Sequence, residues 1–267
     1  MNSEPDCKIE IRDLTMAYGS FVVMRDINAK IKRGEIFIIM GGSGCGKSTL
    51  LRHMIGLKQP AQGDVYYDGV GFWESDEDAR TEKLRSFGVM FQSGALWSSM
   101  TLAENIELVL GEYTEYPPAE IHSIAQLKLA LVGLKGFEEY YPAEISGGMC
   151  KRAGLARALA LDPDILFFDE PSAGLDPISS RNLDNLILQL RDTLGATFVI
   201  VTHELASIFT IGDNSVFLDP NTRTMRARGN PREMLKNSTD PAVQEFLTRG
   251  ESSAKATTAE PINPRAI

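Results

Sequence analysis

The chain has 267 residues, 43% of them hydrophobic, and its 27 Lys and Arg against 36 Asp and Glu give a formal net charge of −9. Such a length can bury one sizeable core, or a core with a satellite subdomain. The acidic balance argues against nucleic acid as a ligand, because neutralising its phosphates requires clustered Lys and Arg. No stretch approaches the roughly 18 to 20 apolar residues that cross a bilayer, and the N-terminus lacks a basic flank followed by an apolar run, so we expect the chain to stay in the cytosol.

Short β-rich runs alternate with helical stretches along the chain, which is typical of a sheet with helices packed on it. Three runs are apolar at nearly every position, as expected for central parallel strands covered on both faces: Ile36–Met40, Ile165–Phe168 and Thr197–Val201. Further strands are predicted at Ile9–Arg12, Phe21–Ile31, Asp64–Tyr67, Phe87–Phe91 and Ser215–Leu218. Residues 102–160 contain no comparable run and are rich in Leu, Ala, Glu and Lys, which predicts a mostly helical subdomain that interrupts the sheet domain.

A charge run at residues 74–85 has its acids early and its bases late, which matches the dipole of a helix. Ser75 is a residue type that is preferred at the N-cap of such a helix. We interpret this run as a solvated helix rather than a binding site.

A last helix is predicted near the C-terminus, where Asp240 and Pro241 have the types preferred at the N-cap and first helical position. Gly250 is placed to stop this helix, and its narrow apolar stripe requires something to pack on. That surface is either a second subunit or the chain's own domain. Residues 251–267 hold Ser, Thr, Ala and Pro without an aromatic residue, so we expect a disordered tail.

An octapeptide fits the phosphate-loop pattern G-x-x-x-x-G-K-[ST] without mismatch, and Thr49 follows it. Glycines let successive backbone N–H groups point at phosphate oxygens, and the following helix N-terminus adds positive partial charge. Lys47 supplies a full charge for the β- and γ-phosphates of a nucleotide, and Ser48 supplies a hydroxyl ligand for Mg²⁺. The octapeptide consists of Gly41, Gly42, Ser43, Gly44, Cys45, Gly46, Lys47 and Ser48.

Two carboxylates, Asp169 and Glu170, directly follow the strand Ile165–Phe168. Open α/β sheets bind ligands at the carboxyl ends of their strands. Asp169 suits a Mg²⁺ shell, and Glu170 is placed to orient and deprotonate an attacking water, whereas the alternative is a solvated strand end. His203 follows the third apolar strand, and there we expect it to sense the γ-phosphate rather than to be structural.

The segment Ile145–Met149, followed by Lys151, Arg152 and Ala156–Leu159, resembles the signature loop of ATP-binding-cassette (ABC) ATPases. The resemblance implies an α/β fold with a P-loop NTPase (RecA-like) core, an antiparallel β edge subdomain and an inserted α-helical subdomain. It divides the chain into a first core part (1–92), a helical subdomain with the signature motif (93–160), a second core part (161–229), a C-terminal helical element (230–250) and a tail (251–267).

The same resemblance assigns roles to residues outside the phosphate loop. Tyr18 matches the aromatic residue that stacks on adenine, and Gln92 matches the glutamine that reaches the Mg²⁺ or the attacking water. Asp176 ends a loop that touches the partner subunit, and His203 takes the switch-histidine position. ATP is then expected between the Lys47 loop of one subunit and the signature residues Ser146, Gly147 and Gly148 of a second copy, in a head-to-tail dimer.

The segment Phe91–Trp97 and the residues Met149 and Asp176–Ile178 look like those of the ATPases of mammalian-cell-entry (MCE) transporters, which include the Mla phospholipid-trafficking system. This implies an ATP-hydrolysing, energy-coupling subunit bound peripherally to the cytoplasmic face of the inner membrane. The implied partners are a membrane permease, an MCE-domain lipid-binding protein and a STAS-domain regulator, with phospholipid or another hydrophobic molecule as cargo and no nucleic acid.

Four apolar residues after Gln92 are unusual for a free loop: Ala95, Leu96, Trp97 and Met100. Exposed apolar patches mark partner surfaces, so we hypothesise that these residues line the groove for the permease's coupling helix. The alternative is that they pack inside the helical subdomain.

Cysteine chemistry is a second open point. Three widely spaced cysteines, Cys7, Cys45 and Cys150, predict reduced thiols rather than disulfides. Cys45 lies among amides and beside Lys47, which favours a thiolate, so its two interpretations are a redox switch and a tolerated small residue.

Two other kinds of ABC protein fit the sequence less well. Soluble ABC-class ATPases of DNA repair or translation insert a long coiled coil between phosphate loop and signature, or carry two cassettes. This chain has one set of motifs and a short interval between Lys47 and Ser146. A non-hydrolysing scaffold is expected to lack Glu170 or His203, and both are present.

Overall fold

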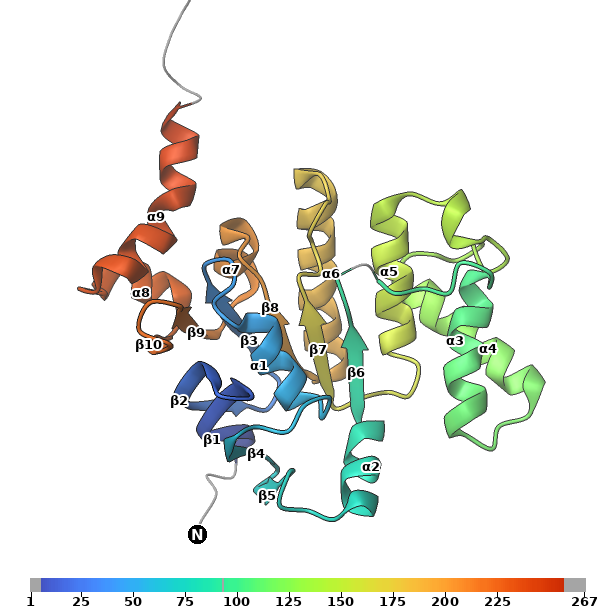
Figure 1. Ribbon diagram of the computed structural model, residues 1–267. Coiled ribbons are helices and arrows are strands. Elements are labelled where there is room, and N and C mark those ends of the chain that lie inside the picture. The colour runs from blue at the N-terminus through green and yellow to red at the C-terminus, as the bar shows by residue number, and fades with distance from the viewer. Residues whose placement is uncertain (1–5, 93, 257–267) are drawn as a thin grey trace, which may run out of the picture.

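The computed structural model describes residues 6–92 and 94–256. A larger sheet of six strands, in the order β10-β9-β3-β8-β7-β6, runs through the middle of the molecule (Figure 1). All its neighbouring strands pair in parallel except β10, which is antiparallel to β9. The strands are β3 (Ile36–Gly41), β6 (Phe87–Met90), β7 (Ile165–Asp169), β8 (Thr197–Val201), β9 (Asn214–Asp219) and β10 (Thr224–Gly229).

The predicted parallel centre is confirmed, since β3, β8 and β7 are adjacent in this sheet. Every residue of β3 and β8 is buried. Side chains alternate between two cores on opposite faces, with Ile38 and Ile200 in one and Ile39 and Val199 in the other. Burial on both faces removes any polar side of the strand, which is why these segments are apolar at nearly every position.

A smaller antiparallel sheet, in the order β2-β1-β4-β5, packs with α1 (Lys47–Met54) against one face of the larger sheet. Its strands are β1 (Cys7–Tyr18), β2 (Phe21–Lys32), β4 (Gln62–Tyr67) and β5 (Val70–Gly71). This is the predicted antiparallel edge subdomain. Sequence patterns missed β5, which has 2 residues, and β10, whose pattern of half-buried and exposed positions gives no apolar run.

The predicted helical subdomain comprises α3 (Leu102–Tyr113), α4 (Pro118–Leu131), a short 3₁₀ turn (Pro142–Glu144) and α5 (Gly147–Ala158). It lies beside β6, at the opposite side of the molecule from the C-terminal helix (Figure 1). A capping box begins α3: the Thr101 Oγ1 accepts from the Glu104 N–H at 3.2 Å, and the Glu104 carboxylate accepts from the Thr101 N–H at 2.7 Å.

The charge run forms α2 (Glu77–Arg85), which has no buried residue and is therefore the expected solvated helix. Its N-cap is Asp76, not Ser75 as predicted. The Asp76 carboxylate accepts a hydrogen bond from the Ala79 N–H at 2.8 Å, whereas the Ser75 hydroxyl donates to the Gly71 carbonyl at 2.6 Å. The β4–β5 hairpin thus offers Ser75 a competing acceptor that local sequence does not reveal.

The remaining helices are α6 (Pro177–Leu194), α7 (Leu205–Ile211), α8 (Pro231–Asn237) and α9 (Pro241–Ala256). As predicted, Asp240 caps α9, and its carboxylate accepts from the Ala242 N–H at 2.9 Å. The stripe of α9 packs on the chain's own domain, where the rings of Phe246 and Phe217 lie 5.2 Å apart.

The predicted end of this helix at Gly250 is wrong, because α9 continues to Ala256. A glycine inside a helix costs only about 1 kcal/mol relative to Ala, and the residues after it favour helix. The predicted disordered tail is therefore wrong for residues 251–256, and its remainder, residues 257–267, lies outside the described residues.

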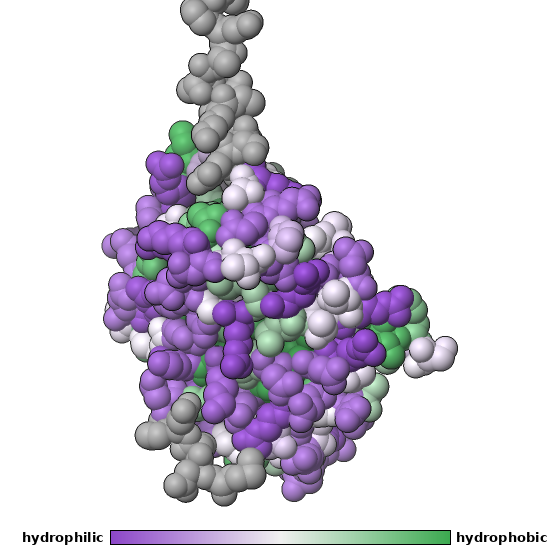
Figure 2. Space-filling model, turned by 90° about the vertical axis from the view of Figure 1, so that its left-hand side faces the viewer, coloured by the Kyte–Doolittle hydropathy of each residue, from purple (hydrophilic) through white to green (hydrophobic). Residues whose placement is uncertain are grey.

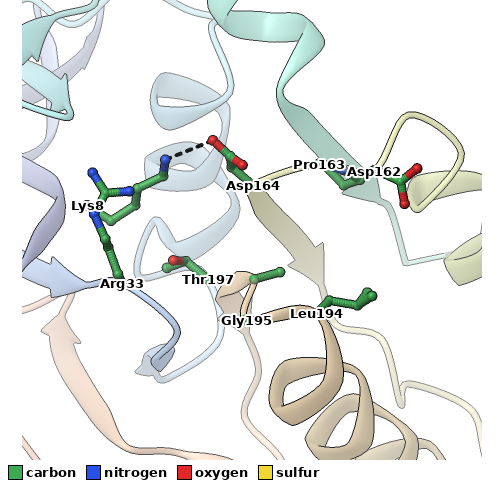
Figure 3. A pocket seen from close by; sticks show the side chains of 9 residues that line it. Lys8, Arg33, Asp162, Pro163, Asp164, Leu194, Gly195 and Thr197 are labelled. Atoms are coloured by element: carbon green, nitrogen blue, oxygen red, sulfur yellow. Dashed lines mark hydrogen bonds and ion pairs between the residues drawn. The ribbon is translucent and has the colours of Figure 1, made fainter.

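A cavity of about 280 Å³ lies where β7 and β8 begin, at the edge of the sheet opposite the phosphate loop. Its buried wall includes Lys8 of β1, whose ammonium group bonds to Asp164 at 3.0 Å (Figure 3) and to Asp68 at 3.1 Å. The pair with Asp164 fastens the smaller sheet to the start of β7, and the pair with Asp68 joins β1 to the β4–β5 turn within that sheet.

None of the helices that the structure describes combines the length and apolarity needed to cross a lipid bilayer. On the face seen in Figure 2, hydrophilic side chains cover most of the surface and apolar ones are scattered. Scattered apolar residues of this kind are normal on a protein surface.

A buried polar contact joins α6 to α7. The Asp184 carboxyl group, 5% exposed, accepts a hydrogen bond from the Ser207 hydroxyl at 2.8 Å. Burial raises the pKa of Asp184 to about 6, the bond from Ser207 opposes this, and the charge of Glu204 adds to it. The folded chain therefore binds this proton more tightly than the unfolded chain does, so the associated stability is present below about pH 4 and is lost as pH rises through 6.

We predict that Asp184→Asn stabilises the fold at alkaline pH, because Asn keeps an acceptor for Ser207 without the buried charge. A shift of about two pKa units corresponds to about 3 kcal/mol over the whole titration of Asp184, and roughly half of this remains to be lost above pH 5. The difference in unfolding free energy from the unaltered chain should therefore widen by ~1.4 kcal/mol between pH 5 and pH 8. Urea denaturation at both pH values measures it, with Asp192→Asn, at a 66% exposed side chain, as the control. A difference that does not change with pH would contradict the prediction.

Candidate functional site

A cavity of about 520 Å³ opens at the carboxyl ends of β3 and β7. It brings together residues predicted from the phosphate loop, from the end of β7, from the segment after β8 and from Gln92. It also includes three residues that sequence patterns did not assign to this site: Leu205, Phe246 and Arg249. The complete lining is Gly41, Gly42, Ser43, Gly44, Lys47, Ser48, Gln92, Glu170, His203, Leu205, Phe246 and Arg249.

The phosphate loop leaves β3 through Gly41, which has a φ of 151°. A Cβ atom at this position would lie 2.4 Å from the Leu218 carbonyl oxygen, so only glycine fits between β3 and β9. The Lys47 side chain, 9% exposed, reaches back from α1 and donates to the carbonyls of Gly41 at 3.0 Å and Gly42 at 3.1 Å. The buried ammonium group is thus held at the wall of the cavity by the loop itself.

Two of the three side chains predicted to bind Mg²⁺, those of Ser48 and Asp169, meet at this edge, and the third, Gln92, lines the cavity. The Ser48 hydroxyl, at the start of α1, donates to an Asp169 carboxylate oxygen at the end of β7 at 2.9 Å. Mg²⁺ prefers oxygen ligands in an octahedral shell and takes many of them from phosphate and water. A hydroxyl and a carboxylate in contact beside the phosphate loop fit that donor set.

Glu170 has a left-handed backbone conformation, with a φ of 51°. This conformation is uncommon outside glycine, and such strain persists only where the surroundings enforce it. Here the Glu170 N–H donates to the Val201 carbonyl at 2.8 Å, which ties the turn to β8. After this kink the Glu170 carboxylate contacts His203, in the segment that follows β8.

The two carboxylate oxygens of Glu170 have different surroundings. Oε1 accepts a hydrogen bond from His203 Nδ1 at 2.8 Å, so this nitrogen carries the proton. Oε2 is buried and has no hydrogen-bond partner among the described residues. Glu170 lines the cavity beside a phosphate-binding loop, and a carboxylate that keeps one oxygen without a protein partner there suits a water molecule that is to lose a proton.

The signature residues lie elsewhere in the chain. The Ser146 hydroxyl caps α5 and accepts from the Met149 N–H at 3.3 Å. Ser146 and Gly148 line a separate cavity of about 420 Å³ between α4, α5 and α6. Asp176 caps α6 and accepts from the Ile178 and Ser179 N–H groups at 3.0 Å each. One chain therefore does not bring Ser146, Gly147, Gly148 or Asp176 into the lining of the phosphate-loop cavity.

Tyr18, at the end of β1, is 48% exposed and does not line the cavity either. The Lys58 ammonium nitrogen lies 3.2 Å from the centre of its ring. A hydrogen bond with the Thr49 side chain is the main cause that lowers the pKa of Tyr18. Thr49 therefore links Tyr18 to the first turn of α1, the helix that begins at the phosphate loop.

A family model described as "ABC transporter" matches residues 24–173. The chain belongs to the ABC transporter family. It is 38% identical over 244 residues to the intermembrane phospholipid transport system ATP-binding protein MlaF of Haemophilus influenzae, covering 91% of each chain. It is 37% identical over 239 residues to MlaF of Escherichia coli K12, covering 90% of this chain and 88% of the relative.

A second group of relatives has a different printed name. The probable ribonucleotide transport ATP-binding protein mkl of Mycobacterium tuberculosis is 43% identical over 239 residues, which are 90% of this chain. The chain spans 66% of the length of that mycobacterial relative.

Solved structures of ABC cassettes share the fold. The structure of cbiO1 from Clostridium perfringens, part of the ABC transporter complex cbiONQ, superposes with a TM-score of 0.80 at 25% identity and covers 95% of this chain and 100% of its own. A dimeric ATP-binding cassette in a post-hydrolysis state, bound to ADP and Pi, superposes with a TM-score of 0.74 at 30% identity and covers 83% of this chain and 98% of its own.

Cys45 of the cassette is not in an environment that favours a thiolate, so the predicted thiolate at this position is wrong. The side chain is 1% exposed, and burial raises the pKa of its thiol. Lys47 opposes this shift but is the smaller effect. The Lys47 ammonium group is instead engaged by the carbonyls of Gly41 and Gly42.

We predict that Cys45 of the cassette is the slowest of its cysteines to be alkylated, because its thiol is both buried and protonated. At pH 8, iodoacetamide should modify Cys45 at least about tenfold more slowly than the half-buried Cys150. Peptide mass spectrometry measures both rates, and unfolding in guanidinium should make them equal. Modification of Cys45 as fast as Cys150 in the folded chain would contradict the prediction.

Proposed function

We propose that this chain is the ATP-hydrolysing, energy-coupling subunit of an ABC transporter, an enzyme that converts ATP and water to ADP and phosphate. The observation that carries the proposal is the pairing of Glu170 with His203 opposite the phosphate loop, with Glu170 Oε2 buried and without a partner among the described residues. This arrangement supports deprotonation of a water molecule at the γ-phosphate.

The roles of the other residues follow from their positions. Lys47 and the amides of the loop bind the β- and γ-phosphates, and Ser48 and Asp169 hold Mg²⁺ together with Gln92. The ion, when bound, neutralises charge on the phosphate oxygens. Glu170 takes the proton from water, and His203 orients Glu170 and contacts the γ-phosphate.

We infer that the site is completed by a second copy in a head-to-tail dimer. The N-terminus of α5 presents Ser146, Gly147 and Gly148 on a different face from the phosphate loop, so these amides are available to nucleotide held by another chain. Asp176 belongs to the same interface. Tyr18 stacks on the adenine once the Lys58 ammonium group has moved off the Tyr18 ring. The dimeric cassette that this chain superposes on supports this arrangement.

The transported class we propose is phospholipid or another hydrophobic molecule, in an MCE/Mla-type system. The match to MlaF over about nine-tenths of both chains supports this assignment. The partners are a membrane permease, an MCE-domain protein and a STAS-domain regulator. With its permease, the subunit lies at the cytoplasmic face of the inner membrane.

An apolar groove of about 310 Å³ is suited to the permease's coupling helix. It lies between α2, β6, α3 and α5 and is lined by Leu84, Phe87, Val89, Val109, Tyr113, Arg157 and Leu161, among others. The loop after Gln92 borders it, because Arg157 donates to the Ala95 carbonyl at 2.7 Å. Trp97 is 58% exposed and does not line this groove, whereas Leu96 packs partly buried against the helical core. None of the four loop residues predicted to line a docking groove lines this one, so the proposed docking site consists of residues of α2, β6, α3 and α5, with the loop at its border.

We predict that Glu170→Gln binds ATP with unchanged affinity, accumulates as a dimer with ATP and Mg²⁺, and loses hydrolysis by about 10²- to 10⁴-fold, the usual contribution of a general base. Phosphate release and light scattering measure the two effects, and Glu112→Gln, at an exposed position of α3, is the control. Retained hydrolysis would mean that Glu170 is not the base.

We predict that Val109→Glu places a charge in the groove, abolishes stimulation of ATP hydrolysis by the permease and leaves the basal rate of the isolated chain unchanged. Trp97→Ala should weaken stimulation at least about threefold, since aromatic truncation at an interface core is costly. Rates in permease-containing liposomes measure both, with Leu127→Glu, at a 56% exposed residue of α4, as the control. Normal stimulation of the Val109 variant would exclude this groove as the docking site.

A further inference from the structure

The signature helix α5 is fastened to the loop after Gln92 by side chains that donate to backbone carbonyls. The Lys151 ammonium group donates to the Gln92 carbonyl. Arg157 donates to the Gly94 carbonyl at 3.0 Å and to the Ala95 carbonyl at 2.7 Å. Lys151 and Arg157 thus bond the start and the middle of one loop to a single helix.

The helix and this loop are in unusually close contact. A Cβ atom at position 154 of α5 would lie 3.1 Å from the Gly94 carbonyl oxygen and 3.2 Å from its Cα, so glycine at 154 lets the loop lie flat against the helix. Ala95 has a left-handed φ of 50°, an uncommon conformation for a residue with a side chain. The path of the loop is therefore enforced by its contacts with α5.

Lys151 differs from Arg157 in its surroundings. It is 7% exposed, and burial lowers the pKa of its ammonium group while the charge of Glu170 opposes that effect. Its ammonium group contacts the backbone of Gln92 and is close enough to Glu170 to be influenced by the charge of that carboxylate. A single side chain of the signature helix thus interacts with two residues of the proposed ATP site, Gln92 and Glu170.

We propose that Lys151 is a positioning residue, which fixes the Gln92 loop to the signature helix so that any displacement of the Ser146 end of α5 moves Gln92 relative to Glu170. The contacts of Lys151 do not depend on the proposed ATPase function, but the effect on catalysis that we infer from them rests on it. A buried, charge-assisted hydrogen bond is short and directional, so helix and loop shift as one body rather than independently. Closure of a second copy on Ser146, or movement of a permease against the loop, is then transmitted through Lys151 to the ATP site.

The first test measures the loop directly and needs no enzymatic activity. Trp97 lies in this loop, and Trp73→Phe removes the other tryptophan, so the remaining fluorescence reports the loop alone. In that background, Lys151→Met should raise the acrylamide quenching constant of Trp97, whose side chain is already 58% exposed, by about 1.2- to 1.5-fold, because a loop released from α5 is more open to solvent. Lys151→Arg, which keeps a cationic donor, should restore the original constant.

Lys128→Met is the matched control, since Lys128 is also a buried lysine of the helical subdomain, 4% exposed, and pairs with Asp162. Its thermal unfolding should match that of Lys151→Met while its Trp97 quenching stays unchanged. Equal quenching in the Lys151 and Lys128 variants would mean that Lys151 only supports the fold, and unchanged quenching in Lys151→Met would overturn the proposal.

The second test measures catalysis. Lys151→Met should lower kcat by about 10- to 100-fold, as expected for losing a hydrogen bond to a charged group, and raise the Mg²⁺ concentration for half-maximal rate, with the Kd for ATP unchanged. Lys151→Arg should recover most of kcat. An unaltered chain that hydrolyses no ATP would overturn the proposed function alone, whereas normal hydrolysis and Mg²⁺ dependence in Lys151→Met would overturn this inference alone.

Discussion

The structure depends on the enclosure of one ammonium group, that of Lys47, by the carbonyls of Gly41 and Gly42 at the carboxyl edge of the larger sheet. A buried cation is tolerated only where fixed oxygens replace its water ligands, and here the backbone carbonyls of two glycines supply those oxygens. The glycine at position 41 is required because β9 passes within contact distance of it. β3, buried on both faces, fixes where this loop begins, so the cation has a defined position before any ligand binds.

The opposing negative charges lie two strands away. In the order β3-β8-β7, the strand between them, β8, leads to His203. Asp169 reaches across to Ser48, and Glu170 turns in a left-handed conformation toward His203. The parallel arrangement is what allows this, because it places the carboxyl ends of three strands from distant parts of the chain at one edge. Changing the strand order would separate Lys47 from Glu170 even if every motif were intact.

Local sequence is sufficient wherever a property depends on neighbours in the chain. The continuous apolar runs of β3, β7 and β8 and the spacing of Lys47 and Ser48 belong to this class. Sequence patterns give the wrong prediction where contacts with a distant segment of the chain decide the property. Gly71 draws the Ser75 hydroxyl away from the α2 N-cap, and burial under the edge sheet gives Cys45 a raised rather than a lowered pKa. From the sequence alone, Lys151 is one more polar residue of the signature helix. Only the fold shows that its ammonium group bonds to the Gln92 carbonyl.

The division of the motifs between two cavities has a mechanical consequence. The phosphate loop belongs to the rigid parallel core, whereas Ser146 belongs to a helical subdomain that meets this core beside β6. A ligand that binds both must hold two bodies together, and its cleavage must release them, since a ligand shifts an equilibrium only by its differential contacts. To move a membrane partner, an ATPase subunit needs an element whose position changes when the nucleotide is cleaved. We propose the loop between Gln92 and Trp97 as that element. This loop is bonded to the signature helix on one side and borders an apolar groove on the other, so the contacts that we propose for nucleotide and for permease meet in the same few residues.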